Sequence, residues 1–190
     1  AGMPGICDPG ENIAMRAKSE GINIICIPGA CAAITALVSS GLPSSSFVFE
    51  GFLPKKKIDR EKILLEISKN DKTTIVYESP KRVKRLLEEL FDFCGGDREI
   101  MVARELTKKF EEHIGNNIYD VIDFFKKREV IGEITIVIKG ISKKRDSKFN
   151  SSELKQELRE LIKAGLSLSA ASKYLAKKAG IKKSEIYNLN

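Results

Sequence analysis

The sequence has few of the residues from which metal centres and nucleophilic triads are built. It contains a single histidine, His113, and four cysteines that form no C-x-x-C pair. We therefore expect no metal site, because zinc needs a cluster of Cys, His or carboxylate ligands. A Ser-His-Asp or Cys-His nucleophile would depend on the one imidazole, and we predict that His113 is an ordinary surface or helix-to-loop residue. Scattered cysteines without a regular framework favour a reduced, cytoplasmic protein.

Long apolar runs are also lacking. No stretch approaches the ~20 apolar residues that a membrane-spanning helix needs. The 190 residues are 42% hydrophobic and 31% charged, which is usual for a globular protein of one or two domains. The chain begins with Ala1 rather than Met and opens inside a glycine-containing loop, so we expect that an upstream segment is missing.

Positive charge is concentrated at one end of the chain. The formal net charge is +7, and residues 141–190 carry 12 Lys and Arg against 5 Asp and Glu, so they hold the whole surplus. Such asymmetry indicates a polyanionic partner, with nucleic acid as the first candidate. The alternative is that the lysines only solvate a helical segment that has few aromatic residues.

Hydrophobic periodicity predicts an α/β protein in which helices and strands alternate. The predicted helices cover residues 11–20, 31–40, 59–69, 80–93 and 118–127. The predicted strands cover residues 22–27, 47–52, 73–77, 100–103 and 134–138. The strand at 22–27 is nearly all apolar, as strands buried in parallel sheets are.

Composition divides the chain into four parts. Residues 1–44 are predicted to belong to a first subdomain, and residues 45–141 form a second α/β subdomain. The polar, charged residues 142–150 form a linker, and residues 151–190 form a helical module. In this module we predict helices at 154–164, 168–179 and 184–188, with a tight turn at Gly165, which is typical of a small helix-turn-helix unit.

Two loops in the first subdomain contain almost only small residues. They read AGMPGICDPG at residues 1–10 and PGACAA at residues 28–33. Because both loops lack bulky side chains, a ligand can lie directly on their backbone groups. Open α/β sheets form ligand crevices where strands end in such loops. Each loop alone fits a simple turn, but together they favour a cofactor cleft.

The order of motifs along the chain resembles the ribosomal RNA small subunit methyltransferase I family of tetrapyrrole-methylase-like (class III) S-adenosylmethionine enzymes. The motifs are AGMPGICDPG (1–10), PGACAAITAL (28–37), GLPSSSFVFEGFLP (41–54), YESPKR (77–82), ARELTKKFEE (103–112) and GEITIVIKG (132–140). The chain departs from the family at its start. Family members carry a further N-terminal strand and loop that complete the cleft, and their first loop usually reads D-A-G-T-P, where this chain has Met3 in place of Thr.

The resemblance implies a two-subdomain class III methyltransferase fold with a truncated first subdomain and S-adenosylmethionine as cofactor. It places cofactor-binding positions at Ala1, Gly2, Met3, Ile6, Cys31, Ala32, Glu78 and Leu106. A ribose hydroxyl is a poor nucleophile, so we expect Glu105 or Glu78 to assist its deprotonation. Phosphate contacts supply much of nucleic-acid affinity, so we expect RNA-binding residues at Arg82, Arg104, Lys108, Lys55, Lys56, Lys57, Lys177, Lys178, Lys182 and Lys183.

The activity implied by the resemblance is 2′-O-methylation of a cytidine in 16S ribosomal RNA of the small ribosomal subunit, carried out by a homodimer. Two alternatives are open. One is methylation of a tetrapyrrole, as in cobalamin precursor synthesis, which would need no basic helical tail. The other is a non-enzymatic nucleic-acid-binding adaptor, which binding of S-adenosylmethionine would exclude.

Overall fold

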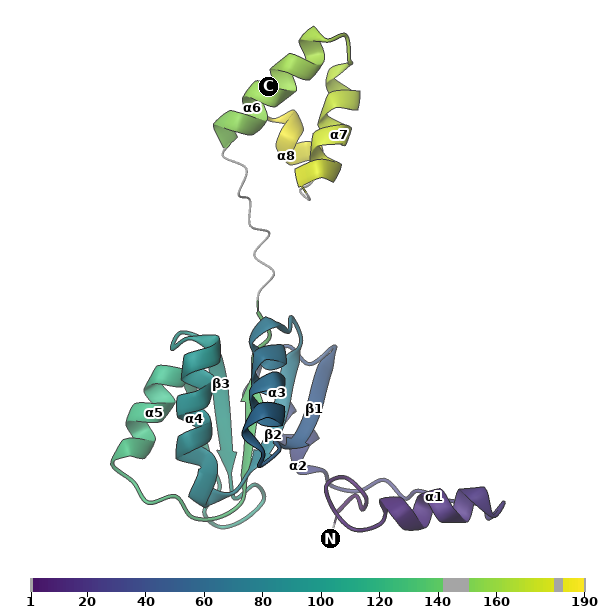
Figure 1. Cartoon of the computed structure of the whole chain (residues 1–190), viewed down its shortest axis with the longest axis vertical. Coiled ribbons are helices and arrows are strands. Elements are labelled where there is room, and N and C mark those ends of the chain that lie inside the picture. The colour runs from purple at the N-terminus through teal and green to yellow at the C-terminus, as the bar shows by residue number, and fades with distance from the viewer. Residues whose placement is uncertain (1, 142–150, 180–182, 190) are drawn as a thin grey trace. The chain divides into compact units, whose positions relative to one another are not determined.

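The computed structural model describes residues 2–141, 151–179 and 183–189. Contacts within the chain define two compact units, Ala1–Ile141 and Ser142–Asn190, and each is described by itself (Figure 1). The division that the sequence predicts between residues 44 and 45 stays a prediction. The predicted linker at 142–150 lies outside the described residues.

The first unit is built on a mixed sheet of five strands in the order β1-β2-β5-β3-β4. The strands are β1 (Phe47–Phe52), β2 (Thr73–Glu78), β3 (Glu99–Arg104), β4 (Glu112–Asn117) and β5 (Ile134–Ile138). β1 is parallel to β2, and the other neighbouring pairs are antiparallel. β5 lies at the centre, where Ile136 is opposite Val76 of β2 on one side and Val102 of β3 on the other.

Helices cover both faces of this sheet. α3 (Lys57–Lys69), α4 (Pro80–Cys94) and α5 (Ile118–Lys126) pack on one face, and α2 (Ala32–Ser40) packs on the other (Figure 1). Successive side chains of a strand point to opposite faces. In β2, Val76 therefore joins the core beneath the three helices, while Ile75 joins the core beneath α2. The central strands are thus apolar on both faces, as their β-branched runs predict.

Most predicted elements of the first unit are confirmed to within two residues at each end. Strand β4 was not predicted, because its residues EHIGNN contain no β-branched run and the strand forms through main-chain pairing with β3. His113 lies in β4, so the prediction that it follows a helix is wrong. It is partly exposed, and its Nε2 atom lies 2.8 Å from Glu111 Oε1.

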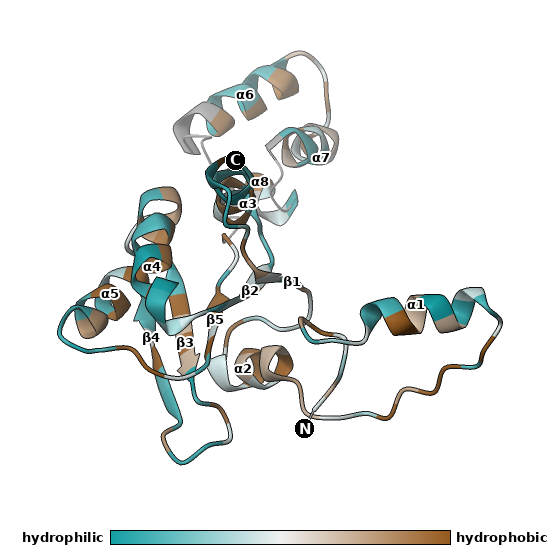
Figure 2. Cartoon of the chain, turned by 60° about the horizontal axis from the view of Figure 1, so that its bottom comes forward, coloured by the Kyte–Doolittle hydropathy of each residue, from teal (hydrophilic) through white to brown (hydrophobic). Residues whose placement is uncertain are grey.

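The prediction of a buried strand at residues 22–27 is wrong. This segment has no regular structure and extends between α1 (Glu11–Ser19) and α2, where its apolar residues are brown in Figure 2. Ile25 and Ile27 are about 80% exposed. A strand needs hydrogen bonds from a neighbouring strand, and none of the five strands of the sheet pairs with this segment. The preceding helix α1 forms as predicted but has no buried residue.

The described residues of the second unit form three helices with a core of their own. They are α6 (Ser151–Lys163), α7 (Leu168–Ala179) and α8 (Lys183–Tyr187), which confirms the helices predicted here. Leu158, Leu175 and Ile186, one from each helix, are fully buried against one another. Gly165 has the positive φ of 97° that the turn between α6 and α7 requires. In the described part of the chain, no helix combines the length and apolarity needed to cross a membrane.

Candidate functional site

The two small-residue loops meet beside the carboxyl end of β2 and enclose a cavity of about 520 Å³, called here the main cavity. Met3 N–H donates a hydrogen bond of 2.8 Å to the carbonyl oxygen of Ala30, so the loops are joined through their backbones. This contact requires glycine. A Cβ on Gly29 would lie 3.2 Å from the carbonyl carbon of Gly2, and one on Gly2 would lie 2.8 Å from the Ala30 oxygen. Residues of both loops therefore line one cavity, and its use as a cofactor cleft stays a prediction.

Most of the predicted cofactor-binding positions lie in this cavity. Gly2, Met3, Ile6, Cys31, Ala32 and Glu78 all contribute to its lining. Leu106 does not, because its side chain packs against the apolar cluster between α2 and the sheet. Ala1 lies outside the described residues. Residues 132–135, which include the first two residues of β5, also line the cavity, although they were not among the predicted cofactor-binding positions.

Tyr77 fixes the start of α2 at the wall of the main cavity. Its hydroxyl accepts a hydrogen bond of 3.0 Å from Ala33 N–H, one of the free donors in the first turn of that helix. Its ring packs edge-on against Phe49, with a centroid distance of 5.1 Å. Burial, with a smaller contribution from Cys31, raises the pKa of Tyr77 to about 12. The phenol therefore stays neutral at physiological pH.

Glu78, at the end of β2, has a fully buried carboxylate that lines the main cavity. Its Oε1 atom accepts hydrogen bonds from Ser79 N–H at 2.8 Å and from Arg82 Nε at 2.7 Å. Its Oε2 atom lies 3.5 Å from Arg60 Nη2. Because donors occupy both oxygens, the geometry favours a role for Glu78 in positioning these arginines over its predicted role as a base.

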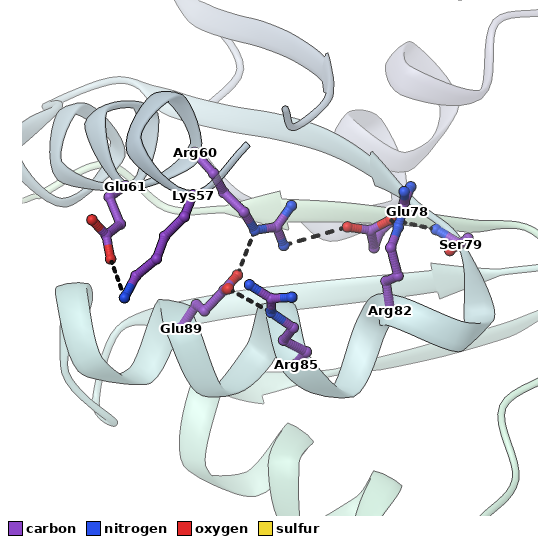
Figure 3. A network of polar contacts seen from close by, with 8 residues as sticks. All are labelled: Lys57, Arg60, Glu61, Glu78, Ser79, Arg82, Arg85 and Glu89. Atoms are coloured by element: carbon purple, nitrogen blue, oxygen red, sulfur yellow. Dashed lines mark hydrogen bonds and ion pairs between the residues drawn. The ribbon is translucent and has the colours of Figure 1, made fainter. Parts of the chain in front are cut away.

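The contacts of Glu78 extend into a polar network between α3 and α4 (Figure 3). Arg60 Nε donates to Glu89 Oε2 at 2.6 Å, and Arg85 Nε donates to Glu89 Oε1 at 2.9 Å. Arg60, Arg82 and Arg85, together with Pro54 and Lys55, line a second cavity of about 290 Å³, called here the arginine cavity. Arg60 and Glu89 were not among the predicted site residues. The i, i+4 spacing of Arg85 and Glu89 on α4 was the available signal.

Glu105, the other predicted base, lies in the loop after β3 with a positive φ of 52°. Its Oε1 atom accepts a hydrogen bond of 2.8 Å from Glu133 N–H and lies 3.0 Å from Lys108 Nζ. These donors, the Glu133 N–H first, hold the pKa of Glu105 below its ordinary value, so this carboxylate is ionised at neutral pH. A Cβ on Gly132 would lie 2.5 Å from Glu105 Cγ, so Glu105 packs directly against a residue that lines the main cavity.

The structure does not bring the predicted RNA-binding residues Arg82, Arg104 and Lys108 into one cavity. Arg82 lines the arginine cavity, while Arg104 lines a separate hollow of about 280 Å³ near α5. Arg104 Nε donates to Glu112 Oε2 at 2.8 Å, across the paired strands β3 and β4. Lys108 bridges Glu105 and Glu133 at 3.0 Å each.

The predicted basic positions outside these loops are mostly exposed. Lys55 lines the arginine cavity, Lys56 precedes α3, and Lys57 lies 3.7 Å from Glu61 within that helix. In the second unit, Lys177 and Lys178 lie in the last turn of α7, and Lys183 begins α8. Lys178 pairs with Glu157, and Lys183 donates a hydrogen bond of 2.7 Å to Ser169. Lys182 lies outside the described residues.

Comparison with known proteins places this arrangement in a family. Residues 1–122 match the family described as Tetrapyrrole (Corrin/Porphyrin) Methylases. All 190 residues align with the ribosomal RNA small subunit methyltransferase I of Synechocystis sp. at 38% identity, and they cover 68% of that protein. The chain belongs to the ribosomal RNA small subunit methyltransferase I family. It spans about two thirds of the length of this relative.

Solved structures agree on the fold. The methyltransferase CobJ superposes with a TM-score of 0.57 at 20% identity, over 74% of this chain and 62% of that protein. Uroporphyrin-III C-methyltransferase of Thermus thermophilus, in a complex with S-adenyl homocysteine, superposes with a TM-score of 0.51 at 15% identity, over 73% of this chain and 62% of that protein. The predicted class III methyltransferase fold is confirmed.

Proposed function

We propose that the protein to which this chain belongs transfers a methyl group from S-adenosylmethionine to the 2′-hydroxyl of a cytidine in 16S ribosomal RNA. The observation that supports this most directly is the main cavity, whose lining includes residues of both glycine-containing loops. Its volume of about 520 Å³ lies in the range usual for small-molecule sites, about 300–1,000 Å³. The relatives named ribosomal RNA small subunit methyltransferase I supply the RNA substrate class.

The residues of the main cavity fit S-adenosylmethionine. Gly2 and Gly29 leave no Cβ at the junction of the loops, so backbone N–H and C=O groups are accessible to the polar ends of a cofactor. Cys31 and Ala32 add a small-residue turn at the start of α2, and Met3 and Ile6 add apolar surface. When bound, the cofactor supplies an electrophilic methyl group on its sulfonium. The neutral Tyr77 phenol holds the start of α2 in place beside it.

The ionised carboxylate of Glu105 is the residue best suited to receive a proton from the ribose hydroxyl. It is partly exposed, and its neighbours Gly132 and Glu133 line the main cavity. Lys108 and Glu133 N–H hold this carboxylate in one orientation, which lowers the cost of aligning acceptor and donor for an in-line transfer. Glu78 instead orients Arg60 and Arg82.

Partners of the protein follow from the same proposal. Residues 141–190 carry the whole positive surplus, and their three helices have a core of their own, so we propose that this module binds ribosomal RNA of the small subunit. We further propose that the protein acts in the cytoplasm as a homodimer.

The proposal is tested by methyl transfer from labelled S-adenosylmethionine to purified small ribosomal subunits, followed by mapping of the modified ribose. The 190-residue chain is compared with the same protein extended to the full length of its relatives. We expect the extended protein to label one cytidine ribose and to bind the cofactor in calorimetry. If the extended protein binds the cofactor but labels a tetrapyrrole and not RNA, the tetrapyrrole alternative is favoured. If the extended protein does not bind the cofactor, both RNA methylation and tetrapyrrole methylation are refuted.

A further inference from the structure

The arginine cavity collects positive charge from three separate elements. Lys55 comes from the loop after β1, Arg60 from α3, and Arg82 and Arg85 from successive turns of α4. Figure 3 shows the guanidinium groups of the three arginines directed into the space between α3 and α4. The cavity of about 290 Å³ has room for a group of the size of a phosphate. This surface is distinct from the main cavity, although Glu78 adjoins both.

The hydrogen-bond donors of these arginines exceed what the neighbouring carboxylates accept. Three guanidinium groups carry about fifteen N–H donors, whereas the two carboxylates of Glu78 and Glu89 offer about eight lone pairs. One of those lone pairs accepts Ser79 N–H. The network therefore retains a positive charge and several N–H donors, to which Lys55 adds an ammonium group.

Arg60 is the most buried cation of the cluster. Its side chain is only 6% exposed, and its partners are Glu78, which is fully buried, and Glu89, which is shared with Arg85. Nearly buried charges are stable when they are both paired and hydrogen-bonded. An anion bound in the cavity would complete the neutralisation of this cluster.

The geometry of the cluster suits a phosphate group in particular. Arginine presents a planar fork of donors that matches two oxygens of a phosphate or carboxylate. Glu78 and Glu89 hold the three guanidinium groups in place before any ligand binds, so little side-chain freedom remains to be lost. Because Glu78 also lines the main cavity, an anion held here lies next to the proposed methyl-transfer site.

We propose that the arginine cavity binds a backbone phosphate of the RNA strand that carries the methylated ribose. This inference rests on the function proposed above and assigns Arg60 and Arg85 a role in it. The bound phosphodiester would anchor the substrate strand next to the main cavity, while the second unit binds RNA elsewhere.

The first test measures binding of a single-stranded oligoribonucleotide to the 190-residue chain by fluorescence anisotropy over a range of salt concentrations. Arg85→Gln is suitable because this side chain is 65% exposed and its loss leaves the fold intact. Lys84→Gln is the matched control, since it removes the same charge from the adjacent position of α4 and Lys84 does not line the arginine cavity. We expect Arg85→Gln to weaken binding about three- to tenfold and to reduce the salt slope by about 0.7. Equal effects of the two substitutions would overturn the proposal.

The second test uses inorganic phosphate alone. At equal ionic strength, phosphate is expected to raise the unfolding temperature of the parent chain more than chloride does. The Lys84→Gln variant is expected to show the same advantage of phosphate over chloride, and the Arg85→Gln variant is expected to lose it. No difference between phosphate and chloride in the parent chain would refute an anion site. If phosphate stabilises the 190-residue chain but the extended protein does not methylate RNA, the anion site is retained. Its assignment to the methylated RNA strand is then overturned. The two proposals therefore fail separately.

Discussion

Replacing Glu78 with glutamine removes one of the two carboxylates on which the network between α3 and α4 depends. The amide keeps the shape of the side chain and one acceptor oxygen, but it loses the negative charge that faces Arg82 at 2.7 Å and Arg60 at 3.5 Å. Hydrogen bonds to charged groups contribute about 1.5–3 kcal/mol each, and breaking a buried pair costs about 3–5 kcal/mol. Arg60 retains Glu89 at 2.6 Å, and Arg82 is 36% exposed, so both arginines keep some solvation or pairing. We therefore expect the free energy of unfolding to fall by about 3 kcal/mol, at the lower end of that range.

Urea unfolding followed by circular dichroism measures this loss as a shift of the midpoint at constant m value. Glu88→Gln, on the exposed side of α4, is the control and is expected to change the free energy of unfolding by less than about 0.5 kcal/mol. The double variant Glu78→Gln/Arg82→Gln is expected to be less destabilised than the sum of the two single variants by about 1 kcal/mol, because the two side chains interact directly. If Glu78→Gln behaved like Glu88→Gln, the buried carboxylate would not support the network, and the argument for fixed arginines would fail.

Three further predictions concern the loops around the main cavity. Gly29→Ala is expected to lower S-adenosylmethionine affinity in calorimetry about tenfold, because the new Cβ separates the two loops; unchanged affinity would place the cofactor elsewhere. Glu105→Gln in the extended protein is expected to slow methyl transfer about 10²- to 10⁴-fold with unchanged cofactor binding, and Glu129→Gln serves as control; equal rates would remove Glu105 as the base. Hydrogen bonds lower the pKa values of Glu105, Glu111 and Glu112 below the ordinary value of 4.5. Their stabilisation is therefore complete above about pH 4.5 and is lost as the pH falls through the lowered values, which a series of unfolding temperatures checks; constant stability down to pH 3 would contradict it.

Local sequence signals were sufficient for most of the fold. The α4 helix was predictable because Val83, Leu86, Leu87 and Leu90 recur at helical spacing and Pro80 begins the helix, and all four apolar residues are buried. The central strand β5 was predictable because its β-branched run suits a strand covered on both faces. Strand β4 was not, because EHIGNN forms a strand only through its main-chain pairing with β3. Residues 22–27 have the composition of a buried strand, but composition does not supply the neighbouring strand that would bury them.

The parts of the candidate site that are formed by backbone contacts between the glycine-containing loops were predictable from the sequence. The ion pairs between side chains far apart in the sequence were not. The small residues at Gly2 and Gly29 indicated a cleft directly, and the structure joins them through backbone contacts. The pairing of Glu78 with Arg60 could not be read from the sequence, because Arg60 lies on α3, 18 residues away along the chain. The pairing of Arg104 with Glu112 likewise depends on the register of β3 and β4, which the sequence alone does not show.

Because Tyr77 lies at the wall of the main cavity, the intrinsic tyrosine fluorescence of the protein can report whether the cavity is occupied. The sequence contains four tyrosines and no tryptophan, so emission from phenol rings is not masked by indole. Tyr77 is half-buried with its hydroxyl bonded to α2, whereas Tyr119, Tyr174 and Tyr187 are each about half exposed or more. An adenine-containing molecule entering beside Tyr77 should quench one tyrosine out of four. Titration of unlabelled protein, with Tyr77→Phe as the silent reference, would then follow occupancy without any dye.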